Sequence, residues 1–230
     1  MRSVEHWSAE HVGALAVTAA VTALLVAGAR LRGLPWAVPV ARGLAVVILA
    51  GFACEHLTYV LRDRWTVEVN LPLHLTDAVT LASIAALWRP RAGLLVELVY
   101  FWALSASLQA VLTPDLGESF PDPLFLTYFV THSGAVAAAC LLVFGMGLRP
   151  RAGAAWRAFG ATLAFAVLAA AGTLLTGGNY MFLRHKPDDG SLLDLMGPWP
   201  VYIAVAAAVG LAMFGALAAL ASRGGTRAAP

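Results

Sequence analysis

The chain has 230 residues, of which 60% are hydrophobic and only 12% are charged. This composition excludes a disordered protein and is typical of a protein that crosses the membrane several times. The formal net charge of +2 does not indicate a nucleic-acid partner, and none is expected. Both cysteines lie in apolar segments, so no disulfide framework is expected either.

Apolar runs of about 20 residues, each suited to crossing a hydrocarbon core ~30 Å thick, recur along the whole chain. Short connections join them, and no internal repeat is evident. The sequence therefore predicts one all-α domain over residues 1–230, a bundle of seven transmembrane helices. The expected spans are residues 11–31, 38–60, 71–88, 92–112, 124–147, 155–178 and 198–221.

Lys and Arg are distributed unequally between the two sides of this bundle. Ten of the 15 fall in the connections after odd-numbered spans or in the C-terminal tail. Because basic residues stay on the cytoplasmic side, this predicts a multi-pass protein of the cell membrane with its N-terminus outside and its C-terminus in the cytoplasm. Of the 13 acidic residues only Glu97 belongs to the cytoplasmic half. Chemistry is therefore expected in the outer half.

The third span opens with NLPLHLTDAVT, residues 70–80, which places His74, Thr76 and Asp77 at membrane depth. Polar and ionisable residues are expensive there, and each is a candidate for function. Asn70 is expected to be the N-cap of this helix, which puts Thr76 about 8 Å below the helix start.

His132 lies at a similar predicted depth in the fifth span, about 12 Å from its outer end. A hydroxyl becomes a nucleophile when a base lies within hydrogen-bonding distance, and an imidazole from another helix can be that base. We therefore expect Thr76 to attack an acyl ester, His132 to act as general base and then acid, and Asp77 or His74 to orient the imidazole.

Six further polar residues are expected to line the same outward-facing cavity and to contact the substrate. Gln109 or Asn179 is suited to donate a hydrogen bond to a developing oxyanion. A basic cluster in the last outer loop is suited to hold a lipid phosphate, or simply to anchor the loop among headgroups. The six candidates for substrate binding are Glu55, His56, Gln109, Asn179, Tyr180 and Arg184.

Purely structural roles remain open for several of these residues. His74 at a helix start can bond to a neighbouring loop, and a membrane threonine such as Thr76 commonly bonds back to the carbonyl four residues earlier. Glu55 can pair with Arg62 or Arg64 close by in the sequence.

Two other functions use the same residues. A zinc-dependent hydrolase is disfavoured because no H-x-x-x-H pair places two ligands on one helical face, so neither a metal nor any other cofactor is expected. A non-enzymatic protein that binds or transports a lipid or small solute also explains buried Glu55, Asp77 and His132. Against transport, the cytoplasmic half has few ionisable groups to complete a path.

The segments LPLHLTD (71–77), QAVLTPDL (109–116) and NYMFLRHKP (179–187), together with His132, resemble the YwaF-like bacterial integral membrane family. That family is similar to eukaryotic transmembrane protein 164, and the resemblance covers roughly residues 45–205. The eukaryotic relative is a phospholipid acyltransferase that uses a membrane Cys and a His. It is in turn reminiscent of the androgen-induced family of intramembrane lipid hydrolases, which use Thr and His.

The resemblance implies that the Cys position falls on Thr76 and the His position on His132, and that membrane lipids are the substrates. Thr stands where the acyltransferase has Cys, and a threonine depends on its base more than a thiolate does. The change favours hydrolase-like chemistry over acyl transfer through a thioester.

Overall fold

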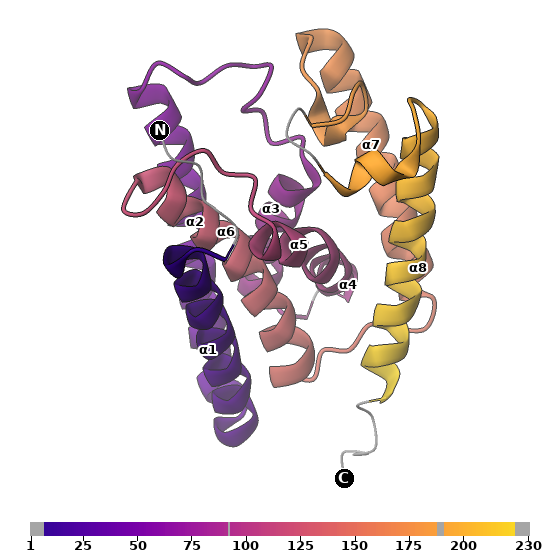
Figure 1. Ribbon diagram of the computed structural model, residues 1–230. Coiled ribbons are helices and arrows are strands. Elements are labelled where there is room, and N and C mark those ends of the chain that lie inside the picture. Colours follow the sequence, from indigo (N-terminus) through magenta and orange to yellow (C-terminus); the bar gives the residue numbers. More distant parts are fainter. Residues whose placement is uncertain (1–6, 92, 188–190, 224–230) are drawn as a thin grey trace.

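The computed structural model describes residues 7–91, 93–187 and 191–223, and within these ranges its regular structure is entirely helical (Figure 1). Two five-residue π-helical segments extend the α-helices without a break: Ala103–Ser107 joins α4 to α5, and Leu141–Gly145 continues α6. The helices are α1 (Ala9–Arg32), α2 (Leu34–Leu61), α3 (Leu75–Trp88), α4 (Gly93–Trp102), α5 (Leu108–Leu112), α6 (Pro123–Cys140), α7 (Ala154–Thr176) and α8 (Val201–Arg223).

Local signals in the sequence account for several helix ends. The Ser8 side chain accepts from the third residue of α1, and Asp122 accepts from the backbone N–H of Leu124 before the Pro-initiated α6. Gly33 joins α1 directly to α2 with φ of 74°, and Gly177 ends α7 with φ of 82°. Such positive φ values favour glycine, which has no Cβ.

Six helices in the described residues are long and apolar enough to cross a membrane, and each lies within four residues of an expected span. The expected third span differs. α3 has only 14 residues and so is about 21 Å long, which is shorter than the ~30 Å hydrocarbon core.

The expected start of this third helix is wrong. α3 begins at Leu75 with His74 as its N-cap, whereas Asn70 precedes the helix and accepts a hydrogen bond from the backbone N–H of Thr66 at 2.9 Å. The backbone N–H of Leu71 donates to the hydroxyl of Tyr180 at 3.1 Å, so tertiary partners hold the segment before α3 in a non-helical form.

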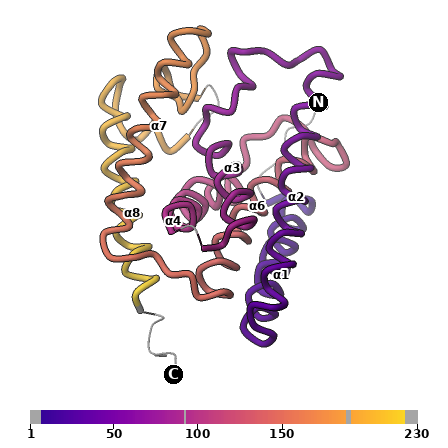
Figure 2. The backbone as a smooth tube through the Cα atoms, turned by 180° about the vertical axis from the view of Figure 1, so that it is seen from behind, coloured from indigo at the N-terminus to yellow at the C-terminus, as the bar shows by residue number. Residues whose placement is uncertain are grey.

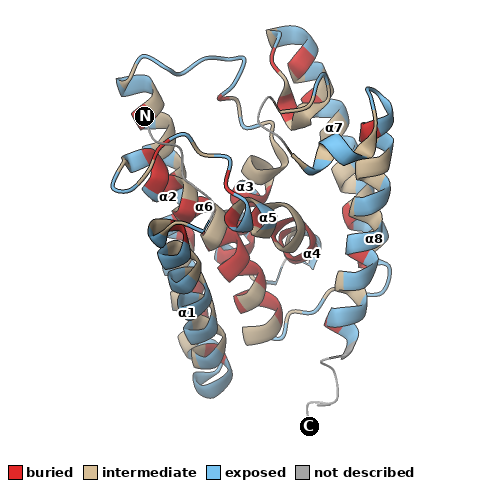
Figure 3. Cartoon of the chain, viewed as in Figure 1, coloured by how far each residue is buried: buried red, intermediate tan, exposed pale blue. Residues whose placement is uncertain are grey.

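The bundle has a packed centre with more exposed helices around it. Residues buried from solvent and lipid concentrate on α4 and α6, while α1, α7 and α8 expose most of their surface (Figure 3). α3 and α4 lie between the α1–α2 pair and the α7–α8 pair in both views of the backbone (Figures 1 and 2). The α4 helix is seen nearly end-on in these views, so it is steeply inclined to α2 and α8.

Two glycines let α2 and α6 approach closely. A Cβ on Gly51 would lie 2.6 Å from Cγ1 of Val130, and one on Gly134 would lie 2.7 Å from Cγ1 of Ile48. Neither distance is sterically allowed, so both contacts require glycine. The close contact lies one helical turn from Glu55 and fixes the level at which α2 presents this residue to α6.

A buried carboxylate ties α4 to the start of α7. Glu97 is only 1% exposed, and its Oε1 lies 2.7 Å from Nε of Arg151 and 2.8 Å from Nη2 of Arg157. The backbone N–H of Arg151 donates to the same oxygen at 3.2 Å. We call these three residues the Glu97 clamp.

Candidate functional site

His74 and Asp77 are bound to each other and to a loop at the start of α3. The backbone N–H of His74 donates to Oδ2 of Asp77 at 3.1 Å, and the N–H of Met181 donates to Nδ1 of His74 at 3.4 Å. The imidazole also packs edge-on against the ring of Tyr180 with centroids 5.3 Å apart. His74 therefore makes the loop contact that the sequence left open as its structural role.

Thr76 is the second residue of α3 and is half-buried. Its carbonyl accepts a hydrogen bond from the Thr80 hydroxyl at 2.8 Å, but its own hydroxyl donates to no residue that the structure describes. The usual back-bonding partner would be the carbonyl of Pro72, which lies before the helix and out of helical register. The Thr76 hydroxyl is therefore available for a substrate or a base.

His132 is held in one orientation by its own helix. Its Nδ1 lies 2.9 Å from the carbonyl oxygen of Tyr128, and its ring stacks on the Tyr128 ring with centroids 4.2 Å apart. A carbonyl oxygen can only accept, so Nδ1 carries the proton and Nε2 of the neutral ring has the free lone pair. This arrangement leaves Nε2 as the basic atom.

The hydrogen bonds of the His132 imidazole differ from the expected ones. α3 packs against α6, but in the described part of the chain no hydrogen bond joins Thr76 to His132. The group that orients His132 in the structure is the Tyr128 carbonyl, and among the described residues no hydrogen bond joins the ring to Asp77 or His74. The carboxylate of Asp77 is instead engaged at the start of its own helix.

The later start of α3 also changes the depth argument. Thr76 lies one residue from the helix start, so its expected depth of about 8 Å along the helix is wrong. His132 is the tenth residue of α6. The direct packing of α3 on α6 is now the observation that relates the two residues.

A π-helical segment lies beside both helices. Ala103–Ser107 packs against α3 and against α6, and π turns are frequent at functional sites. Among the described residues the buried hydroxyls of Ser107 and of Ser83 in α3 have no hydrogen-bond partner. This segment could not be predicted from the sequence, because nothing in ALSAS distinguishes a π turn from an α turn.

Glu55 has no cation partner among the residues that the structure describes. Arg62 pairs with Asp122 at 2.9 Å and Arg64 pairs with Glu118 at 2.9 Å, so both arginines proposed for Glu55 are engaged elsewhere. The carboxyl of Asp77 is near enough to interact electrostatically with that of Glu55. α2 and α3 therefore bring two acids together without a base.

His56 and Gln109 lie at the edge of this region. Nδ1 of His56 accepts a hydrogen bond from the indole N–H of Trp65 at 3.2 Å. Gln109 is exposed, and only its backbone carbonyl is engaged, accepting from Thr113. The structure thus gives His56 a packing contact and leaves the Gln109 amide free of protein partners in the described residues.

Three of the expected substrate-binding residues instead build the loop after α7. The Tyr180 hydroxyl donates to the carbonyl of Val67, and the Asn179 side chain accepts from the backbone N–H groups of Arg184 and His185 at 3.0 and 3.2 Å. Arg184 donates to the carbonyl of Gly177 at 3.1 Å. These contacts explain the polar residues of the loop structurally.

In the described ranges no group of three or more His, Cys, Asp and Glu side chains is arranged to hold a metal ion. Glu55 and Asp77 interact electrostatically with each other, and their neighbours are described above. The candidate side chains described here carry hydroxyl, imidazole and carboxyl groups.

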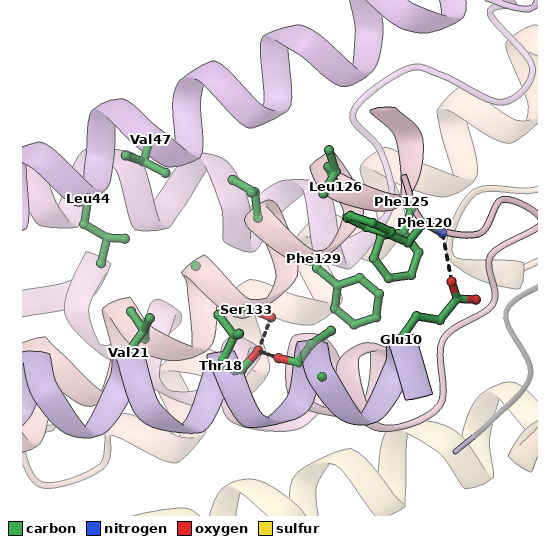
Figure 4. A pocket seen from close by; sticks show the side chains of 16 residues that line it. Glu10, Thr18, Val21, Leu44, Val47, Phe120, Phe125, Leu126, Phe129 and Ser133 are labelled. Carbon is green, nitrogen blue, oxygen red and sulfur yellow. Dashed lines mark hydrogen bonds between the residues drawn. The ribbon is translucent and has the colours of Figure 1, made fainter. Parts of the chain in front are cut away.

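A cavity of about 590 Å³ lies between α1, α2 and α6 (Figure 4). None of the residues expected to be catalytic lines it. Within it the Thr18 and Ser133 hydroxyls lie 2.7 Å apart, and Glu10 accepts a hydrogen bond from the backbone N–H of Phe120 at 3.0 Å. This cavity was not predicted from the sequence, although Thr18 and Gly13 within the first span both line it.

The fold and the composition together define a multi-pass membrane protein built from helices. The chain belongs to the TMEM164 family, whose family model matches residues 2–218. This finding confirms the resemblance to transmembrane protein 164 at the level of the family. Comparison with curated proteins and with solved structures gives no match.

Proposed function

We propose that the protein is a membrane-embedded lipid hydrolase or acyltransferase that uses Thr76 and His132. The observation that carries this proposal is the fixed tautomer of His132, in which Tyr128 holds Nδ1–H and Nε2 is left as a base. The available hydroxyl of Thr76, on a helix that packs against α6, supports it. Membership of the TMEM164 family is compatible with a lipid substrate.

The proposed reaction has two steps. Oγ1 of Thr76 attacks the carbonyl carbon of an acyl ester while its proton passes to Nε2 of His132. The ester C–O bond then breaks, and the leaving alcohol takes that proton. In the second step water or the hydroxyl of a lysolipid attacks the acyl-threonine, with His132 again accepting and returning the proton.

The proposal includes a topology. We propose seven crossings of the cell membrane, with α3 as the short third crossing, the N-terminus outside and the C-terminus in the cytoplasm. The excess of arginines in the connections after odd-numbered spans supports this orientation. The site then opens to the outer leaflet, where Gln109 is a donor candidate for the oxyanion.

A fluorophosphonate lipid probe tests the assignment. The wild-type protein is expected to be labelled in liposomes, and both Thr76→Ala and His132→Ala are expected to lower labelling at least 100-fold. Thr113→Ala is the matched control, because its exposed hydroxyl bonds only within its own helix turn. Normal labelling of the Thr76→Ala protein would show that Thr76 is not the nucleophile.

A second function is favoured by one observation: Glu55 and Asp77 interact electrostatically, and neither pairs with a cation in the described residues. Acids at membrane depth without a cation partner can take up and release a proton, as in proton-coupled carriers. Proteoliposomes in which a solute moves with the pH gradient while all lipids stay chemically unchanged would favour a carrier over an enzyme.

A further inference from the structure

α1 is attached to the bundle at its two ends. Among its described residues only His11 and Ala29 are buried, and they lie 18 residues apart, or about 27 Å along the helix. His11 donates from Nε2 to the carbonyl of Val111 at 2.9 Å, and Arg30 donates to the carbonyl of Phe144 at 2.8 Å. Between these anchors the Thr18 hydroxyl bonds to Ser133 of α6, and a space remains beside this contact.

The cavity between α1, α2 and α6 occupies this space, and we call it the α1 groove. Its rim is exposed: Val17 and Val21 on α1 are 63% and 42% accessible, and Val47 on α2 is 53% accessible. Its floor is formed by α6, where Phe129 and Gly134 are buried. The groove therefore opens sideways along helices that cross the membrane, towards the lipid.

The α1 groove is polar at one end and mostly apolar along the rest of its length. Glu10 is the one charged residue of its described lining and lies at one end, bonded to the backbone N–H of Phe120 (Figure 4). From Glu10 to Val21 the helix rises about 16 Å, which is half of the ~30 Å hydrocarbon core. The Thr18 and Ser133 hydroxyls between them bond to each other, so no polar ligand is needed there.

We propose that the α1 groove binds one acyl chain of a membrane lipid, with the chain running from the level of Glu10 to that of Val21. The volume of 590 Å³ is in the range of pockets that hold small ligands, and the lining is almost entirely apolar. Water is disfavoured in such a space, whereas lipid chains surround its opening. One leaflet is as deep as the groove is long, which selects a single chain over a larger partner.

This site is separate from the one proposed for catalysis. Val130, Ser133 and Ala137 share the face of α6 that lines the groove, and His132 points about 100° away from Ser133. The inference therefore does not rest on the proposed enzyme activity. A protein without acyl turnover would be expected to bind the chain equally well.

Photocrosslinking in nanodiscs tests the inference. The full-length protein is placed in phosphatidylcholine that contains a small share of phosphatidylcholine with a diazirine in one acyl chain, and crosslinked peptides are mapped after irradiation. The groove-lining segments of α1, α2 and α6 are expected to be labelled at least fivefold more than the exposed faces of α7 and α8. Equal labelling of all lipid-facing helices would overturn the proposal.

A cavity-filling variant gives the control. Gly13 lines the groove, and a Cβ on it would meet no atom within 4 Å, so Gly13→Phe is expected to fill the space without a backbone clash. This change is expected to lower groove labelling at least threefold. Gly160→Phe on α7, where a Cβ also meets nothing within 4 Å, is expected to have no effect.

Two further outcomes would contradict the proposal. If Gly13→Phe and Gly160→Phe leave groove labelling equally high, the chain does not occupy the α1 groove. Protein–protein crosslinks at α1 in place of lipid crosslinks would show that a second copy of the chain covers this surface. Thermal melting of each variant identifies any loss of folding that would account for reduced labelling.

Discussion

The buried carboxylate of Glu97 and the half-buried carboxylates of Glu55 and Asp77 have opposite surroundings. Glu97 receives hydrogen bonds from two guanidinium groups and a backbone N–H, which satisfy its charge. Glu55 and Asp77 interact electrostatically, and neither has a cation partner in the described residues. A buried carboxylate whose charge is fully paired has a structural role. Acids at membrane depth without a cation partner are instead typical of a functional site.

The contrast also separates two tasks in one bundle. The Glu97 clamp joins α4 to α7 and the segment before it, so it fixes elements that carry none of the proposed catalytic residues. Glu55 and Asp77 lie on the helices that pack against α6, which carries His132. Changing the two groups in the same way should therefore affect stability in one case and function in the other.

The largest effect is expected from removing both arginines of the Glu97 clamp. Arg151→Met with Arg157→Met leaves the buried Glu97 carboxylate with the backbone N–H of Arg151 as its remaining donor in the described residues, so the free energy of unfolding is expected to fall by more than in Glu97→Gln. Unfolding in detergent micelles measures the loss. Adding Glu97→Gln should restore at least half of it, since the unpaired charge is then gone.

If the double arginine variant unfolds like the wild type, the ion pairs of the Glu97 clamp do not stabilise the fold. The same result would follow if water reached the carboxylate, and Glu97→Gln alone distinguishes these cases. In a satisfied clamp this single change is expected to lower stability by about 1–3 kcal/mol, because donors lose a charged acceptor.

The next effect concerns the contact that positions Glu55. Gly51→Ala places a methyl group 2.6 Å from Val130 Cγ1, and overpacking of this kind lowers stability by about 1–3 kcal/mol. Gly43→Ala on the same helix is the control, because its Cβ meets no atom within 4 Å. Thermal unfolding should separate the two variants, and equal melting temperatures would show that α2 and α6 have room to spare.

A smaller effect on stability, with a larger one on function, is expected for Glu55→Gln. The change removes a carboxyl without a cation partner and keeps its shape, so the free energy of unfolding should change by less than about 1 kcal/mol. Labelling by the lipid probe is expected to fall at least tenfold if the acid supports the site. Unchanged labelling would assign Glu55 to packing.

Much of the architecture was predictable because the bilayer limits the choices. Apolar runs of about 20 residues fixed six helices within a few residues of their observed ends. The third helix was misplaced because its start depends on distant residues: Tyr180 and Met181 bind the segment before it and its N-cap, and no local pattern records these contacts. Asn70 has the residue type of an N-cap, but its side chain accepts a hydrogen bond from Thr66 in the preceding loop.

The site was predictable in part for the same reason. Depth in the membrane singled out His132 and Thr76, but not which atom orients the imidazole, because the Tyr128 carbonyl is a backbone group present in any helix. The loop contacts of Asn179 and Tyr180 could not be predicted, since polar residues at a helix end serve loops as readily as ligands. The α1 groove depends on how far one helix stands from another, which sequence does not encode locally.

The smallest effect comes from a third kind of carboxylate, one that is paired and partly exposed. Burial raises the pKa of Asp122, but the hydrogen bonds from Arg62 and from the backbone N–H of Leu124, with the charges of Arg62 and Arg64, together outweigh it and hold the pKa below the ordinary value of 3.8. Stability from this pair is therefore complete above pH 3.8 and is lost as the pH falls through the lower, folded pKa.

Asp122→Asn isolates this contribution because asparagine still caps α6. At pH 7 the variant is expected to be less stable than the wild type by at most about 1 kcal/mol, since the pair is partly solvated. The difference should shrink as both proteins are melted at successively lower pH values below 3.8, where the wild-type carboxylate takes up a proton. A difference that persists there would show that the carboxylate charge and its pair with Arg62 do not account for the stabilisation. Pairing with a cation would then no longer explain why the carboxylates of this bundle differ in their effect on stability.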